Sequence, residues 1–349
     1  MPNVGKSTLF NALTDAEVLA ANYPFATIEP NTGIVPIPDD RLQKLAKIYK
    51  TEKIVPATVT FVDIAGLVAG ASQGEGLGNQ FLSHIRSCNA VCQVVRAFAD
   101  PNVQNSGTSD PKKDIEIINT ELILADIQTV NNRLPKLEKE VKADSKLRPD
   151  LELLQKVKAG LNEGNLAGSF LDDEEREAIK DLQLLSAKPF VFVFNVDDSQ
   201  LNDDKLKAEL SSLVSPAPAI FISAKLESEL RGLDEADRQE MLESYGQTES
   251  GLVQLIHAAY AALGLQSYLT AGEKEVRAWT ISKGATAPQA AGAIHSDFER
   301  GFIAAQVVHY KDLIEAGSEA AAKAAGKVRT EGRTYVMRPD DVVEFKFNV

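Results

Sequence analysis

Four apolar runs, rich in β-branched and aromatic residues, punctuate the first 265 residues of the chain. They cover residues 59–67, 90–98, 189–196 and 218–223. Short continuous runs of this kind are typical of strands that are buried on both faces of a sheet. Stretches with helical periodicity separate them, so the pattern predicts an α/β fold with a parallel sheet.

Residues 113–183 have a different pattern, with apolar residues at alternating steps of three and four along a polar stretch. This spacing is typical of a coiled-coil seam, and a second apolar stripe follows it after a polar break. We expect an antiparallel helical hairpin inserted into the α/β domain. The two stripes are Ile123, Ile127, Val130, Leu134, Leu137 and Val141, and then Leu147, Leu151, Leu154 and Leu161.

The pattern changes again after Gly264, where three strand-like runs surround a stretch rich in small residues. They predict a separate α+β domain whose length is sufficient for independent folding. The sequence therefore predicts an α/β domain of residues 1–112 and 184–265, a helical insertion of residues 113–183, and a C-terminal domain of residues 266–349.

Charge is unevenly distributed over these domains. The chain of 349 residues has a formal net charge of -13, which argues against a simple nucleic-acid binder, and we expect no DNA partner. Residues 267–349 carry equal numbers of acidic and basic residues, and a basic cluster lies among them. It is either a solvated face or a contact for RNA. The cluster consists of Lys323, Lys327, Arg329, Arg333 and Arg338.

Cysteine content and hydropathy restrict the location of the protein. Cys88 and Cys92 lie in an apolar run without further metal-ligand residues nearby, which favours buried thiols over a zinc site. The sequence contains no apolar stretch of membrane-spanning length and no charged-then-apolar leader. These features predict a cytoplasmic protein without a membrane partner.

The N-terminus contains the second half of a phosphate-binding loop, G-x-x-x-x-G-K-[ST]. Gly5, Lys6 and Ser7 match it, and Val4 and Thr8 flank it. In such loops, backbone N–H groups and a helix N-terminus surround the phosphates. The lysine reaches the β- and γ-phosphates, and the serine hydroxyl binds Mg²⁺. We therefore expect a nucleoside triphosphate and Mg²⁺ at this loop.

Residues farther along the chain complete the pattern of a P-loop NTPase. Asp63 follows a predicted strand, where it would hold Mg²⁺, and Gly66 would sense the γ-phosphate. Thr27 lies between loop and strand, where a switch threonine would cap Mg²⁺. The base would be read at two further strand ends, the ligand edge of an open α/β sheet. These residues are Asn195, Val196 and Asp198, and then Ser223, Ala224 and Lys225.

These motifs together resemble the YchF family of Obg-related P-loop ATPases over nearly the whole chain. PNVGKSTLFNALT, FVDIAGLVAGASQGEGLGNQFL, FVFNVDD and ISAK match its ATPase core, and residues 279–308 and 326–349 match its TGS domain. The resemblance implies an ATPase core, a coiled-coil insertion and a β-grasp TGS domain. It also implies a role connected with ribosomes and stress responses, with contacts to the ribosome or its RNA through the TGS and coiled-coil domains.

The base-reading motif departs from two patterns. Guanine-specific relatives carry a lysine where this chain has Val196. The YchF family typically ends the motif with glutamate, and resembling it implies adenine contacted by Asn195. This chain ends the motif with Asp198, and an aspartate can read guanine. We expect a preference for ATP, and GTP binding stays open as an alternative.

The residues that would activate water are unusual. Leu67 follows Gly66 where Ras-like enzymes place a glutamine, and a leucine cannot polarise water. Many family members carry a histidine in the loop that corresponds to residues 100–111. Here that loop offers only Gln104 and Asn105, of which Asn105 is our candidate. We therefore predict slow hydrolysis in a nucleotide-controlled switch. Asn3 is either a turn residue or a ligand for K⁺ beside the phosphates.

Two function classes remain on the sequence alone. One is a switch that hydrolyses ATP slowly, and the other is a ribosome- or RNA-binding module with a weakened nucleotide site. The family pattern continues upstream of Pro2 with a strand and Gly-Leu. We expect that the natural protein begins roughly ten to twenty residues before Met1, with the central strand of the sheet in that segment.

Overall fold

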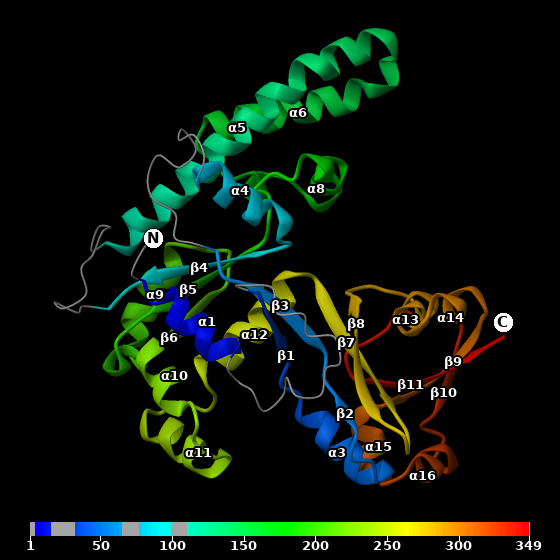
Figure 1. Cartoon of the computed structure of the whole chain (residues 1–349). Coiled ribbons are helices and arrows are strands. Elements are labelled where there is room, and N and C mark those ends of the chain that lie inside the picture. The colour runs from blue at the N-terminus through cyan, green and yellow to red at the C-terminus, as the bar shows by residue number, and fades with distance from the viewer. Residues whose placement is uncertain (1–3, 15–31, 65–76, 99–109, 349) are drawn as a thin grey trace. The chain divides into compact units, whose positions relative to one another are not determined.

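The computed structural model describes residues 4–14, 32–64, 77–98 and 110–348 (Figure 1). Contacts divide the described chain into two compact units. The first unit contains residues 4–14 and the described part of 62–255, whereas the second contains residues 33–61 and 256–348. The chain therefore passes from the first unit to the second and back before it reaches Asp63.

The first unit contains a parallel sheet of three strands in the order β4-β5-β6. These strands are β4 (Val91–Arg96), β5 (Phe190–Asn195) and β6 (Ala219–Ile222). Every residue of the central strand β5 is buried, as the continuous apolar run predicts. The α/β class with a parallel sheet is confirmed. The helices of this unit outside the insertion are α1 (Lys6–Thr14), α4 (Leu77–Ser87), η3 (Asp198–Gln200), α9 (Asp204–Ser212), α10 (Ala224–Leu230) and α11 (Glu235–Ser244).

The predicted strand at residues 59–67 differs from the expectation. The observed strand β3 (Thr58–Val62) pairs with β1 (Thr32–Pro36) in a two-stranded sheet of the described residues. Its side chains alternate in burial, and Val62 is 42% exposed. The expectation of burial on both faces is wrong for this strand, because a second pairing partner and a covering layer are not found among the described residues.

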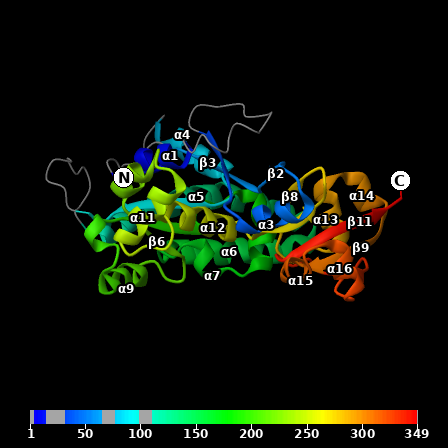
Figure 2. The ribbon, with the colours of Figure 1, turned by 90° about the horizontal axis from the view of Figure 1, so that it is seen from below.

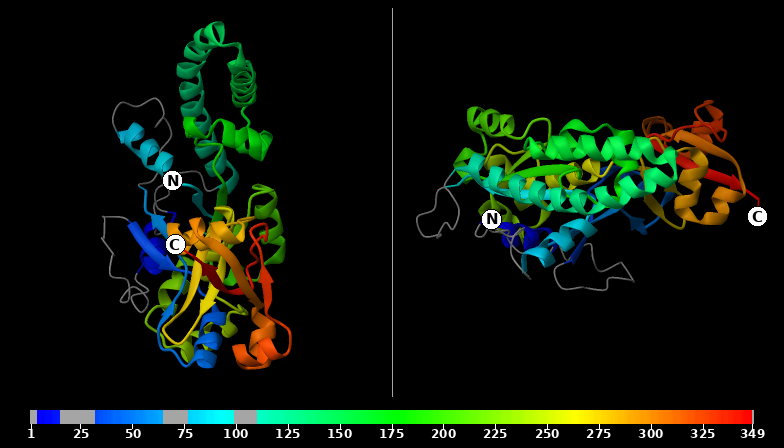
Figure 3. Two further views of the ribbon diagram at one scale, coloured as in Figure 1. Left: turned by 90° about the vertical axis from the view of Figure 1, so that its right-hand side faces the viewer. Right: turned by 90° about the horizontal axis from the view of Figure 1, so that it is seen from above.

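The insertion forms a helical arm (Figures 1 and 3). Helix α5 (Pro111–Ala143) runs outward, η1 (Ser145–Leu147) turns the chain, and α6 (Arg148–Asn162) returns beside α5. The two apolar stripes meet between the helices, where Val130, Leu154 and Leu161 are at most 2% exposed. Three short helices bring the chain back: α7 (Ala167–Phe170), α8 (Asp173–Ala178) and η2 (Lys180–Leu182).

The base of the arm is fixed by a buried carboxylate. Asp126 on α5 is fully buried and accepts hydrogen bonds from the N–H groups of Leu185 and Ser186, both at 2.8 Å, and from the Ser186 hydroxyl at 2.7 Å. Buried carboxylates require such partners. Burial raises the pKa of Asp126, and the hydrogen bonds from Ser186 and Leu185 oppose that shift. Asp126 therefore connects the arm to the segment that leads into β5.

The second unit contains a six-stranded sheet in the order β10-β9-β11-β7-β8-β2. Helices α13 and α14 lie on one side of β9 and β11, and α15 and α16 lie on the other (Figure 2). The strands are β2 (Ile54–Val55), β7 (Leu265–Ala271), β8 (Val276–Ser282), β9 (Phe302–His309), β10 (Arg329–Glu331) and β11 (Asp341–Phe347). The helices are α3 (Asp40–Tyr49), α13 (Ala287–Ile294), α14 (Ser296–Arg300), α15 (Tyr310–Ala316) and α16 (Glu319–Ala324). Helix α12 (Gly251–Ala262) precedes β7.

One strand of this sheet comes from far upstream. Strand β2 pairs in parallel with β8, with Ile54 opposite Val276 and Val55 opposite Arg277. The predicted α/β domain includes this segment within residues 1–112, whereas contacts in the structure group residues 33–61 with residues 256–348. The pairing of β2 depends on a register between distant strands, which local periodicity does not encode.

Candidate functional site

The N-terminal loop leads directly into helix α1. Val4 is buried, and Gly5 has a φ of +89°, a conformation that favours glycine. A Cβ atom at Gly5 would lie 2.3 Å from Nδ2 of Asn195. Leu9 and Leu13 bury one side of α1, whereas Ser7 and Thr8 on its first turn are exposed. The loop therefore presents its polar side chains at the start of the helix.

The structure brings the loop lysine to the predicted metal-binding aspartate. Lys6 Nζ forms an ion pair with the carboxylate of Asp63 and donates to the carbonyl oxygen of Ile64 at 2.6 Å. The hydroxyl of Ser7 lies 3.4 Å from the second oxygen of Asp63. An ammonium, a carboxylate, a carbonyl oxygen and a hydroxyl thus meet, although Lys6 and Asp63 lie 57 residues apart in sequence. Hydroxyl and carboxylate oxygens are ligands that suit Mg²⁺.

Asn195 connects the loop to the end of the sheet. Its side chain is almost completely buried, and its Nδ2 donates to the Val4 carbonyl oxygen at 3.0 Å. Its Oδ1 accepts from the backbone N–H of Ala224, also at 3.0 Å. The Asn195 amide therefore joins the segments of Val4 and Ala224 to its own, which are three of the predicted site segments. These two bonds use one of the two Nδ2 protons and the Oδ1 atom, and the expected contact of Asn195 with the base stays a prediction.

Asp198, Ser223 and Lys225 form a second polar group at the same edge. The Ser223 hydroxyl donates to Asp198, and Lys225 Nζ lies 3.0 Å from the other carboxylate oxygen. The hydrogen bond with Asp198 raises the pKa of the exposed Lys225 ammonium. Ser223 also caps α10 by accepting from the Leu226 N–H at 3.1 Å. Val196 points into the hydrophobic core instead and is 3% exposed.

Several predicted site residues lie outside the described residues. They are Asn3, Thr27, Gly66, Gln104 and Asn105. The described residues hold no group of three or more histidine, cysteine, aspartate or glutamate side chains arranged for a metal ion. Within the described chain, Ser7 and Asp63 are the predicted Mg²⁺ ligands that the fold brings together.

Sequence reasoning missed Glu227, a carboxylate that is 5% exposed on α10. It accepts from the Gly251 N–H at 2.7 Å at the start of α12. Burial raises its pKa, and the backbone bonds to Gly251 and Leu252 oppose the shift. Glu227 follows Lys225 by two residues, and no motif distinguishes it from the exposed acids around it. Only its hydrogen bond to the Gly251 N–H in the folded structure identifies its role.

The basic cluster of the C-terminal domain is largely engaged within the fold. Lys327 pairs with Asp312 at 3.0 Å, and Arg329 with Glu331 at 3.2 Å. Arg333 donates to the carbonyl oxygen of Phe302 at 2.8 Å and lies over its ring. These contacts favour the solvated face over the RNA contact at this cluster, because paired cations are less available to phosphates.

Comparison with known proteins places this arrangement in a family. The chain is 50% identical to the ribosome-binding ATPase YchF of Bacillus subtilis (strain 168), with alignment over 100% of this chain and 98% of that protein. It is 48% identical to the ribosome-binding ATPase YchF of Haemophilus influenzae, again over 100% of this chain and 98% of the relative. The chain belongs to the YchF family.

Domain and structure comparisons agree with this membership. A family model named YchF-GTPase_C, with the description "Protein of unknown function (DUF933)", matches residues 265–348. A second, MMR_HSR1, described as a 50S ribosome-binding GTPase, matches residues 1–133. The structure of the YchF GTPase of Schizosaccharomyces pombe superimposes with a TM-score of 0.87 at 39% identity, covering 99% of this chain and 96% of the other. Among the described residues, no helix has both the length and the apolar character needed to cross a membrane.

Proposed function

We propose that this YchF-family protein binds ATP with Mg²⁺ at the carboxyl edge of β5 and β6 and hydrolyses it slowly. The observation that carries the proposal is the pair of hydrogen bonds of the Asn195 side chain, which donates to the Val4 carbonyl and accepts from the Ala224 N–H, and so joins the phosphate loop to the base loop. The match to relatives named ribosome-binding ATPases over the whole chain supports it.

Each polar residue has a proposed role in this site. Backbone N–H groups of residues 3–8 surround the phosphates, and Lys6 binds the β- and γ-phosphates. When bound, Mg²⁺ would be held by Ser7, Thr27 and Asp63 and would neutralise charge on the phosphates, and Gly66 would contact the γ-phosphate. Asp63 forms an ion pair with Lys6, so the group that would hold the metal lies beside the group that would hold the phosphates.

The base contacts favour adenine. Guanine-reading sites use a lysine stem that packs against the base and a carboxylate that accepts from guanine. In this chain Val196 occupies the position of that lysine, and its side chain is buried in the core. The carboxylate of Asp198 is already bound by Ser223 and Lys225. The backbone at Ser223, Ala224 and Lys225 completes the base pocket. GTP is the alternative nucleotide, because a carboxylate has about four acceptor sites and Asp198 can accept from a base as well as from Ser223 and Lys225.

Slow turnover follows from the residues available to activate water. Leu67 has no polar group for this purpose, so Asn105, with Gln104 as the alternative, orients the attacking water in our proposal. Asn3 is a ligand for K⁺, which would supply positive charge beside the phosphates in place of an arginine. A rate in KCl that exceeds the rate in NaCl would support the K⁺ site, and equal rates would contradict it.

The partner in this proposal is the ribosome, contacted through the arm and the C-terminal domain. The support is the name of the relatives, ribosome-binding ATPase, together with an arm that projects from the first unit. Such a partner places the protein in the cytoplasm. Cosedimentation with ribosomes tests this part, and a protein that stays in the supernatant with and without ATP contradicts it.

Calorimetric titration with ATP and GTP in the presence of Mg²⁺ tests the nucleotide site. We expect tighter binding of ATP, and turnover well below about 10 s⁻¹, the median for enzymes. Lys6→Ala should abolish turnover, whereas Lys142→Ala, an exposed lysine on the arm, should leave it unchanged. A tenfold preference for GTP would overturn the ATP assignment, and absence of binding to either nucleotide would favour the ribosome-binding module.

A further inference from the structure

Residues 33–61 connect two parts of the proposed nucleotide site. They follow the segment that carries Thr27, and they end at the strand that leads to Asp63. Yet they belong to the compact unit of residues 256–348. A movement of this segment is therefore passed along the chain to Asp63 at the end of β3.

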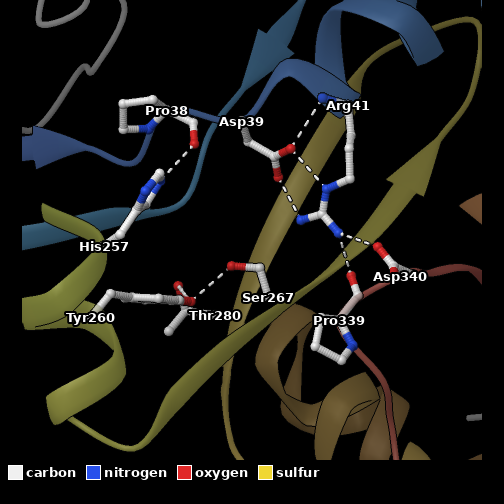
Figure 4. Close-up of polar contacts among 9 residues, drawn as sticks. All are labelled: Pro38, Asp39, Arg41, His257, Tyr260, Ser267, Thr280, Pro339 and Asp340. Carbon is white, nitrogen blue, oxygen red and sulfur yellow. Dashed lines mark hydrogen bonds and ion pairs between the residues drawn. The ribbon is translucent and has the colours of Figure 1, made fainter. Parts of the chain in front are cut away.

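Arg41 on α3 fixes this segment (Figure 4). Its Nε and Nη2 donate to the two carboxylate oxygens of Asp39 at 2.8 and 2.7 Å, a bidentate pair. Its Nη1 donates to the carbonyl oxygen of Pro339 at 2.7 Å and to Asp340 at 3.0 Å. One guanidinium thus joins the start of α3 to the turn before β11, 298 residues away for Pro339.

The surroundings of Arg41 make this a rigid connection. The side chain of Asp39 is only 12% exposed and that of Arg41 25%, so water screens the pair weakly. Asp39 also caps α3 by accepting from the Arg41 N–H at 3.1 Å. On the same helix, Leu42 and Leu45 are at most 2% exposed. We call Arg41 with Asp39, Pro339 and Asp340 the clamp. Helix α3 is therefore held by the clamp at its N-terminus and by its buried apolar face.

Two further contacts fix the ends of the segment. His257 on α12 lies 3.1 Å from the carbonyl oxygen of Pro38. At the other end, the Val276 N–H donates to the Lys53 carbonyl oxygen at 2.9 Å, where β2 pairs with β8. The segment is therefore held from Pro38 to Val55 by residues of the C-terminal half of the chain.

We propose that residues 33–61, clamped by Arg41, form the coupling element between the nucleotide site and the C-terminal domain, with Arg41 as its positioning residue. Nucleotide binding that moves Asp63 pulls on a segment whose strand β2 is part of the six-stranded sheet. By linkage, a partner that binds the C-terminal domain changes the affinity of the site for nucleotide by the same factor. This inference rests on the proposed nucleotide site.

Hydrogen exchange on the full chain tests the coupling, with and without a non-hydrolysable ATP analogue and Mg²⁺. In the wild type, the analogue should change exchange in peptides covering residues 276–282 and 338–342 by about fivefold or more, the usual lower size of allosteric coupling. In Arg41→Ala that change should be lost, while calorimetry shows analogue binding retained. Arg41→Lys should restore part of it, because it keeps the charge without the fork.

Two more variants separate coupling from simple loss of folding. Asp340→Ala removes one hydrogen bond of the clamp but leaves Arg41 paired with Asp39. In this variant the analogue should still change hydrogen exchange in the two peptides, but by less than in the wild type. Lys53→Ala removes an exposed ion pair with Glu275 in the same segment and should behave as the wild type. Coupling is refuted if the wild type binds the analogue without a change in these peptides, or if Arg41→Ala and Asp340→Ala both transmit the change in full. A wild type that fails to bind the analogue refutes the nucleotide site itself.

Discussion

The arm is stabilised by contacts between residues close in sequence, whereas the nucleotide edge of the first unit is stabilised by contacts between residues far apart in sequence. In the arm, apolar residues of α5 meet those of α6 across a short connection, within one continuous stretch of chain. At the nucleotide edge, single polar side chains join residues 4, 195 and 224. The arm can therefore lose stability without disturbing the site, whereas the edge cannot lose one amide without disturbing the whole site.

The largest expected effect is in the arm. Leu154→Ala leaves a cavity between α5 and α6 and should lower the free energy of unfolding of the arm by about 2–5 kcal/mol. Hydrogen exchange of residues 123–161 measures it. Leu153→Ala, at a partly buried position, should cost less. If Leu154→Ala also weakens ATP binding as strongly, the independence of arm and edge is wrong.

At the edge, Asn195→Ala should have the next largest effect. The substitution leaves the Val4 carbonyl and the Ala224 N–H buried without these partners. Each group that stays unsatisfied lowers the stability of the folded site by about 1–3 kcal/mol. ATP affinity measured by calorimetry should fall about tenfold or more. Asn202→Ala, which removes an exposed bond to the Tyr245 carbonyl, is the control. Unchanged affinity in Asn195→Ala would show that the two loops hold themselves in place.

Gly5→Ala tests the approach of the loop to Asn195. A left-handed backbone conformation costs a non-glycine residue about 1–2 kcal/mol, and the new Cβ would displace the Asn195 amide. We expect weaker ATP binding by about tenfold. Gly164→Ala on the arm has a similar φ of +82° but open space around its Cβ. It should bring backbone strain without any loss of affinity, and equal losses in both variants would refute the contact.

The smallest effect concerns Glu227 and appears as a dependence on pH. Because burial raises its pKa above the usual 4.5, the folded protein holds this proton after the unfolded chain has lost it. Stability therefore falls as pH rises from that value through the folded pKa. Glu227→Gln should remove this slope in denaturant titrations, and Glu229→Gln, at an exposed position, should keep it. Identical slopes in all three proteins would contradict the shift.

The sequence is a better guide to the arm than to the site. Both apolar stripes appear in the arm core as predicted, because heptad spacing alone determines which residues face a partner helix. For the site, motif spacing predicts the residues at the strand ends but not their contacts. The sequence does not reveal that the Asn195 side chain bonds to the backbone of Val4 and Ala224, or that Val196 lies in the core. Glu227 has no sequence signal at all.

What the sequence determines by itself is the set of residue types and their order: a lysine and serine after a tight glycine, an aspartate after one strand, polar residues after two others, and a helical arm between. Local propensity and periodicity suffice for these. What only the tertiary structure decides is which distant groups meet. Strand β2 joins β8, Arg41 reaches Pro339, and Glu227 caps α12. Pairing partners and burial are properties of the folded arrangement, because a side chain's contacts depend on every element packed around it.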